Sequence, residues 1–303
     1  MKTGISDRAS LTIFQVREII CGQLGVDDEE LSELVPVKAG MTNITWSFRM
    51  GEQKYLLRLP GAGTDQLINR QEEFSVYQAI AGFGIGDEVI CFDREQGIKI
   101  SRFLENVHTC RPDSQKDIRR CMDQLRRFHE QKLTVPHSFD LRERISYYER
   151  LRQPYSSVHP DYSQTREKMD ILLSYVESLG KERTLCHIDS VCDNFLLYDD
   201  EADRPPVMID WEYAAMQDPH LDVAMFLAYS DFTREQVDQI IGYYFLQGCP
   251  RQLRRKIYSY IALCGFLWSN WCEFKFISGV DFGEYAARQY QLSKIYFNVF
   301  MTE

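Results

Sequence analysis

The sequence predicts an α+β fold with two lobes, a small N-terminal lobe built on an antiparallel sheet and a larger, mostly helical C-terminal lobe. With 303 residues, of which 44% are apolar, the chain can form more than one core. Strand-like alternation of apolar and polar residues is concentrated in the first hundred residues. From about Gln115 onward, long helical patterns dominate. We therefore expect the lobes to span residues 1–103 and 104–303.

The N-terminal lobe begins with an expected helix, for which Ser10 is a candidate cap and Gly25 a candidate end. Residues 43–50 then alternate strictly between apolar and polar side chains, which is the period of a half-buried strand. A turn at "GEQ" leads into a second strand, "KYLLRLP", so the two strands form a hairpin. The apolar positions of the helix are Leu11, Phe14, Ile19 and Leu24.

A second helix is predicted over residues 65–81, after the turn sequence "GAGTD". Residues 89–104 follow as another hairpin, with its turn between Asp93 and Gly97. In the helical lobe, two short apolar runs, "NFLLY" and "PVMID", interrupt the helices between residues 184 and 210. These runs predict a third hairpin.

Composition narrows the classes of partner. A formal net charge of −10 disfavours nucleic acid or an anionic membrane surface as the main partner, because both require a basic face. The nine cysteines show no CxxC spacing or zinc-knuckle pairs, so we expect reduced thiols. No signal peptide and no membrane-spanning run is recognisable. These features favour a cytoplasmic protein with a small-molecule substrate, and leave its oligomeric state open.

The chemistry is concentrated around an HxDxxxxN pattern formed by His187, Asp189 and Asn194, followed by Asp210 at the end of an apolar strand. If the third hairpin forms, Asn194 and Asp210 lie side by side. An amide oxygen and a carboxylate suit Mg²⁺, and Asp189 could then accept the proton of a substrate hydroxyl. The alternative interpretation is a polar loop with a helix-capping aspartate. We expect His187 and Asp222 to give structural support to this loop.

Several ordered motifs resemble the choline kinase branch of the aminoglycoside phosphotransferase superfamily, in particular its bacterial members. The motifs are "AGMTNITW", "KYLLRLPG", "LINRQEEF", "HIDSVCDN" and "IDWEYA", and they extend over nearly the whole chain. The resemblance implies a bilobed fold like that of protein kinases, with ATP and Mg²⁺ as cofactors. It also implies Asp189 as the catalytic base, with Asn194 and Asp210 as metal ligands.

For the nucleotide, the resemblance implies that Gly40, Thr42 and Asn43 lie over the ATP phosphates. Arg58 stands where protein kinases place a phosphate-binding lysine, and a guanidinium keeps the charge but changes the geometry. Glu73 is the expected ion-pair partner of Arg58, although the adjacent Glu72 is an alternative.

Two tryptophans in "FLWSNWCEF" match the substrate pocket of this family. Trp268 and Trp271 are three residues apart and would share one helix face. Core packing explains such a pair equally simply, but a quaternary ammonium is recognised by aromatic faces. The resemblance adds Tyr285 and, less directly, Tyr213 to the pocket. Glu212 could add negative charge near the cation, but we expect it to be an exposed surface residue.

The expected function is therefore the ATP- and Mg²⁺-dependent phosphorylation of choline to phosphocholine. Ethanolamine, thiamine or another small cationic alcohol is the nearest alternative, and an aminoglycoside is a more distant one. A primary ammonium would require hydrogen-bond acceptors, whereas the aromatic pair favours a methylated cation. GTP in place of ATP, and a non-catalytic binding protein that kept the fold, are further alternatives.

Overall fold

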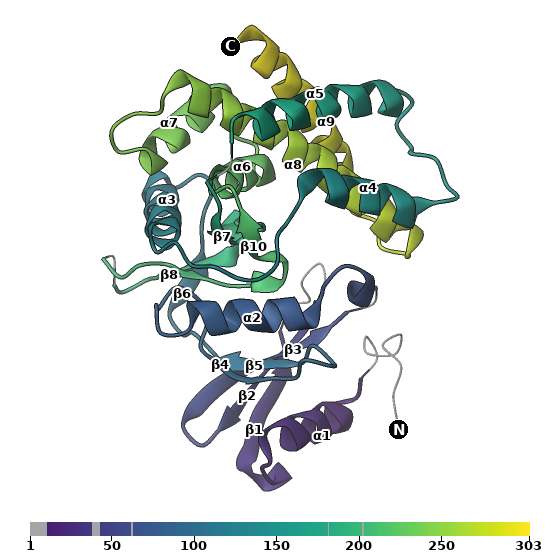
Figure 1. Ribbon diagram of the computed structural model, residues 1–303. Coiled ribbons are helices and arrows are strands. Elements are labelled where there is room, and N and C mark those ends of the chain that lie inside the picture. Colours follow the sequence, from purple (N-terminus) through teal and green to yellow (C-terminus); the bar gives the residue numbers. More distant parts are fainter. Residues whose placement is uncertain (1–10, 38–42, 62, 181, 202) are drawn as a thin grey trace. The chain divides into compact units, whose positions relative to one another are not determined.

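The computed structural model describes residues 11–37, 43–61, 63–180, 182–201 and 203–303. The chain divides into two compact units, Met1–Val107 and His108–Glu303 (Figure 1). The first contains an antiparallel sheet with two helices, and the second is mostly helical. The predicted α+β fold class is confirmed.

A five-stranded antiparallel sheet forms the N-terminal unit, in the order β1-β2-β3-β5-β4. Both predicted hairpins are present: Trp46 pairs with Leu57 between β2 and β3, and β4 pairs with β5. In the β4–β5 turn, the Gly97 amide donates to the Asp93 carbonyl at 2.8 Å. The bounds are β1 Leu31–Pro36, β2 Asn43–Met50, β3 Gln53–Pro60, β4 Val89–Phe92 and β5 Lys99–Arg102.

Helix α1 spans Ile13–Leu24, and its N-cap is Thr12. Thr12 accepts a hydrogen bond from the Gln15 amide at 3.3 Å, and Gln15 accepts one in return from the Thr12 amide at 2.9 Å. This reciprocal capping box starts the helix two residues later than a cap at Ser10 would, and Ser10 lies outside the described residues. Val16 and Ile20 of α1 are buried in the sheet core.

Helix α2 spans Arg70–Ile80, so the predicted helix over residues 65–81 began too early. The Asn69 side chain caps α2 by accepting hydrogen bonds from the amides of Gln71 and Glu72. The preceding residues instead form a separate 3₁₀ turn, η3, at Thr64–Gln66. The strong asparagine cap therefore sets the start of the helix.

The C-terminal unit consists of helices and short strands. The third hairpin is confirmed, because β8 pairs antiparallel with β9 through Phe195 and Met208. Its helices are α3 Gln115–Glu130, α4 Leu141–Arg152, α5 Tyr162–Ser178, α6 His220–Tyr229, α7 Arg234–Tyr244, α8 Arg251–Ile277 and α9 Glu284–Thr302. Its strands are β6 Val107–Thr109, which begins at the division between the units, β7 Thr184–Cys186, β8 Phe195–Tyr198, β9 Val207–Met208 and β10 Ala215–Gln217.

Helix α8 is the central element of the C-terminal unit and is buried over most of its length. It packs closely on α9 at Gly265, where an added Cβ would lie 2.6 Å from the Gln289 carbonyl oxygen. Figure 1 shows these two helices side by side. Within the described ranges, no helix combines the length and apolar character that crossing a membrane requires.

Candidate active site

Asp189, Asn194 and Asp210 come together at the open end of the β8–β9 hairpin. Asn194 belongs to the 3₁₀ turn η4, Cys192–Asn194, and its Nδ2 donates to the carbonyl oxygen of Asp189 at 2.8 Å and to Oδ2 of Asp189 at 3.1 Å. The Ile209 amide donates to the Asn194 carbonyl at 3.0 Å, which brings the next residue, Asp210, to the same place. The hairpin thus assembles the three predicted side chains from two segments of the sequence.

Negative charge is concentrated at this place. Burial, together with the charges of Asp210 and Glu212, raises the pKa of the Asp189 carboxyl to about 8. Because the amide nitrogen of Asn194 faces Asp189, the amide oxygen is left to serve as a ligand. Oxygen donors and excess negative charge fit a hard divalent cation such as Mg²⁺. Asn194 and Asp210 could hold it.

Asp222 supports the loop from the start of α6. One of its carboxylate oxygens accepts the His187 amide at 2.8 Å, and the other accepts the Ile188 amide at 2.7 Å. Ile188 has a φ of +69°, a left-handed conformation that is unfavourable for a β-branched residue. Both amides around this strained residue are therefore fixed immediately before Asp189.

Asp222 is held in turn by a buried chain of hydrogen bonds through His129 and Tyr244. His129 Nε2 lies 2.9 Å from Asp222 Oδ2, and the Tyr244 hydroxyl lies 2.9 Å from His129 Nδ1. His129, Cys186 and Asp222 are close enough together to hold a metal ion, but both ring nitrogens already have protein partners. We therefore interpret this group as a structural support. His187 holds the residue before Asp210 in place, because its Nε2 donates to the Ile209 carbonyl at 2.8 Å.

The two tryptophans of α8 form an aromatic cluster with Tyr213. The indole rings of Trp268 and Trp271 are 5.6 Å apart in an edge-to-face arrangement, and both are buried. Tyr213 lies edge-on to Trp268 at 5.5 Å, and its hydroxyl accepts a hydrogen bond from Trp271 Nε1 at 3.2 Å. Tyr213 follows Asp210 in the 3₁₀ turn η5, Trp211–Tyr213, so the cluster is continuous with the acidic end of the hairpin.

Two aromatic residues of this region were not anticipated from the sequence. Phe282 packs on Trp271 at 5.0 Å, and Tyr229 lies 6.1 Å from the predicted pocket residue Tyr285. The Tyr229 hydroxyl also donates to Asp193 Oδ2 at 2.6 Å, next to Asn194. No periodic pattern marks either residue, because Tyr229 is the last residue of α6 and Phe282 lies between α8 and α9.

Glu212 is buried, with only 7% of its surface exposed, so the expectation of an exposed surface residue was wrong. It lies in η5, between Trp211 and Tyr213, which are buried as well. A glutamate in such a short turn has no sequence period from which its burial could be inferred. Its charge contributes to the raised pKa of Asp189.

In the N-terminal unit, Arg58 of β3 pairs with Glu73 of α2, with Arg58 Nη2 2.5 Å from Glu73 Oε1. This answers the choice between Glu73 and Glu72. Asn43 is the first residue of β2 and is buried, whereas Gly40 and Thr42 lie outside the described residues. Glu73 also contacts a second arginine, Arg70, which the sequence analysis missed although it lies three residues earlier on the same helix face.

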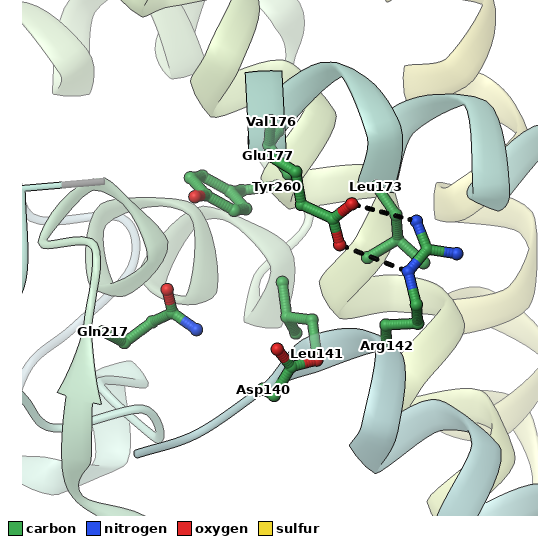
Figure 2. Close-up of a pocket in the computed structure, with 8 residues that line it drawn as sticks. All are labelled: Asp140, Leu141, Arg142, Leu173, Val176, Glu177, Gln217 and Tyr260. Atoms are coloured by element: carbon green, nitrogen blue, oxygen red, sulfur yellow. Dashed lines mark hydrogen bonds and ion pairs between the residues drawn. The ribbon is translucent and has the colours of Figure 1, made fainter. Parts of the chain in front are cut away.

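A small cavity lies in another part of the C-terminal unit, where α4, α5, α8 and β10 meet (Figure 2). Its empty volume, which includes open solvent, is about 220 Å³. Arg142 and Glu177 form a two-point ion pair at its edge, with both N–O distances at 3.2 Å. None of the predicted site residues lines this cavity.

Comparisons with known proteins agree with this geometry. Residues 34–241 match the family model described as choline/ethanolamine kinase. Protein LicA of Haemophilus influenzae is 28% identical over 262 residues, covering 82% of this chain and 76% of the relative. The crystal structure of choline kinase LicA from Streptococcus pneumoniae superposes with a TM-score of 0.80 at 28% identity, covering 94% of this chain and 98% of that one. A structure of LicA in complex with AMP also has a TM-score of 0.80 at 28% identity, covering 94% and 97%.

Proposed function

Because the chain belongs to the choline/ethanolamine kinase family, we propose that it transfers the γ-phosphoryl group of ATP to the hydroxyl of choline, giving phosphocholine and ADP. One observation carries the proposal. Asn194 is hydrogen-bonded to both the backbone and the carboxylate of Asp189, and the hairpin adds Asp210 beside them. A base candidate and two oxygen ligands therefore occur together, as phosphoryl transfer requires.

In this reaction the substrate oxygen bonds to the γ-phosphorus while the bond from that phosphorus to the bridging oxygen of ADP breaks. The hydroxyl proton passes to the Asp189 carboxylate, which the Asn194 amide holds in place. Asn194 and Asp210 are the residues that would hold magnesium. When bound, the metal neutralises phosphate charge.

The aromatic cluster of Trp268, Trp271 and Tyr213, with Tyr285 nearby on α9, is our proposed site for the trimethylammonium group. A cation over an aromatic face gains about 0.5–2 kcal/mol for each well-placed ring. Both indole N–H groups are already used within the protein, because Trp268 donates to Met225 Sδ at 2.8 Å and Trp271 donates to Tyr213. What these residues offer a ligand is therefore apolar ring surface.

The N-terminal unit would supply the nucleotide contacts. Arg58 is held by Glu73 and provides a positive charge for the phosphates. Asn43 stands at the start of β2, directly after the segment of Gly40 and Thr42, which we propose lies over the phosphates. Backbone N–H groups of such a loop are suitable donors to phosphate oxygens.

Ethanolamine is a second candidate substrate, and the burial of Glu212 favours it. A primary ammonium needs hydrogen-bond acceptors, and Glu212 together with the Tyr213 hydroxyl would provide them beside the tryptophans. The quaternary ammonium of choline has no N–H to donate, so its recognition depends on the aromatic rings alone. The two substrates therefore make different demands on the same cluster.

The deciding experiment compares ADP release by the purified protein with Mg²⁺, ATP and one of four alcohols: choline, ethanolamine, thiamine and an aminoglycoside. We expect the highest kcat/KM with choline, and formation of phosphocholine in the ³¹P NMR spectrum. A higher kcat/KM for ethanolamine than for choline would identify ethanolamine as the preferred substrate instead. No phosphorylated product from any of the four would contradict the proposed activity.

A further inference from the structure

Glu73 lies between two arginines in the N-terminal unit. Its Oε1 is 2.5 Å from Arg58 Nη2, and its Oε2 is 2.9 Å from Arg70 Nη1. All three side chains are buried, with exposed fractions of 5% for Arg58, 8% for Arg70 and 1% for Glu73. Each carboxylate oxygen thus has its own guanidinium, which fixes the orientation of the glutamate from both sides.

The neighbouring buried cation, Lys99, is paired in a different way. Lys99 of β5 is the register partner of Arg58 on β3, and it is paired with one carboxylate, Asp87, at 2.6 Å. Its ammonium also donates to the Tyr77 hydroxyl at 2.8 Å. Lys99 therefore has a carboxylate of its own, whereas Arg58 and Arg70 share Glu73.

The fold provides space for the second arginine. Gly97, in the β4–β5 turn, has a φ of +68°, and a Cβ added there would lie 2.5 Å from Arg70 Nε and 2.7 Å from Arg70 Cδ. A side chain at residue 97 would therefore displace Arg70. At the other end, Arg70 is the first residue of α2, directly after the Asn69 cap. The helix start and the turn together place the guanidinium on Glu73.

We propose that Arg70 is a positioning residue for nucleotide binding: it holds the second oxygen of Glu73, and Glu73 in turn holds Arg58 in the orientation that presents it to the nucleotide. This inference rests on the proposed function, in which Arg58 contacts the phosphates of ATP. Without Arg70, the second carboxylate oxygen of Glu73 would lose its buried partner, and the carboxylate could turn away from Arg58.

The test compares steady-state kinetics of Arg70→Met, Arg70→Lys and the wild type, with ATP and choline varied in turn. We expect Arg70→Met to raise KM for ATP about tenfold, the effect of losing one hydrogen bond between charged groups, and to leave KM for choline within about twofold. Arg70→Lys keeps the charge, so its KM for ATP is expected within about threefold of the wild-type value. A purely structural role would change both variants alike.

Gly97→Ala tests the same contact without changing any charged residue. We expect it to raise KM for ATP in the wild-type background and to add no further rise to Arg70→Ala, where the clash with the Arg70 side chain is absent and only the contact with Pro60 Cγ at 3.0 Å remains. Lys99→Met is the control for loss of a neighbouring buried cation: it should lower the melting temperature but leave KM for ATP unchanged. A wild-type KM for ATP in folded Arg70→Met or in Gly97→Ala would overturn the inference. If the wild type itself transferred no phosphate from ATP, the proposed function would fail instead.

Discussion

At the scale of single residues, Asp189 shows how the site is tuned by its surroundings. Burial and the neighbouring charges of Asp210 and Glu212 raise the pKa of its carboxyl to about 8. A strained residue, Ile188, precedes it, and two hydrogen bonds from backbone amides to Asp222 fix that strain in place. Both features cost stability, as is common where function requires a particular geometry.

The raised pKa of Asp189 predicts that Asp189→Asn changes the stability of the metal-free protein by an amount that depends on pH. Below about pH 4 the carboxyl is protonated in both the folded and the unfolded chain. Between there and the folded pKa of about 8, the unfolded chain releases a proton that the folded protein retains, so the wild type loses stability as the pH rises. Asparagine cannot ionise. In thermal melts with EDTA, the melting temperature of the variant relative to that of the wild type should therefore rise from about pH 5 to about pH 8.

Asp203→Asn, a change at an exposed aspartate, is the matched control and should show no such trend. A constant difference in melting temperature between Asp189→Asn and the wild type across this pH range would show that Asp189 has an ordinary pKa.

The residues that the sequence could and could not reveal differ in how they are connected. Asp189, Asn194 and Asp210 stand in fixed spacing around a hairpin with a clear apolar pattern, so their proximity followed from local rules. Tyr229 and Phe282 reach the site through tertiary packing. Glu212 follows Asp210 closely in sequence, but its burial depends on the packing around η5. Arg70 is intermediate, because its i,i+3 spacing to Glu73 was readable but its burial was not.

At the scale of elements, hairpins were predictable and helix starts were less so. Strict alternation and glycine-containing turns predicted the β2–β3 and β4–β5 hairpins. The start of a helix depends on which residue caps it, and in the structure Thr12 caps α1 and Asn69 caps α2 by accepting hydrogen bonds from backbone amides. The Gln15 of the capping box was the available signal at α1.

The α8–α9 contact gives a prediction at this scale. Gly265→Ala should destabilise the protein, because the new Cβ would lie 2.6 Å from the Gln289 carbonyl oxygen and push the two helices apart. Overpacking of this kind typically costs about 1–3 kcal/mol, more than the gain of roughly 1 kcal/mol in helix propensity. The free energy of unfolding in urea measures the difference.

Gly242 of α7 is the matched control, because a Cβ added there has no atom within 4 Å. Gly242→Ala should therefore raise the free energy of unfolding by up to about 1 kcal/mol. The close approach of α8 and α9 would be contradicted if the two alanine variants changed stability in the same direction.

For the molecule as a whole, length, composition and pattern predicted the α+β fold class. The physical reason is that hydrophobic period is a local property that extends over whole elements. How the helices of the C-terminal unit pack is set instead by contacts such as Gly265 on Gln289. These contacts join residues far apart in sequence and leave no pattern.

The distribution of cysteines gives a prediction for the whole chain. All nine cysteines are free thiols, and six of them are buried. Burial raises the pKa of thiols such as Cys272, which slows their reaction. Titration of the native protein with a thiol-specific disulfide reagent should label at most Cys21, Cys91 and Cys249 rapidly, and titration in denaturant should label all nine. Rapid native labelling of the buried six would contradict the packing described.

The central claim is that Asp189 is the base of a phosphoryl transfer whose substrates are bound by other residues. Its most direct test is the turnover of Asp189→Ala with Mg²⁺, ATP and choline, measured together with choline binding by calorimetry. The account predicts that product formation falls at least about a thousandfold while the dissociation constant for choline stays within about threefold. Phosphocholine formation at the wild-type rate by this variant would contradict it.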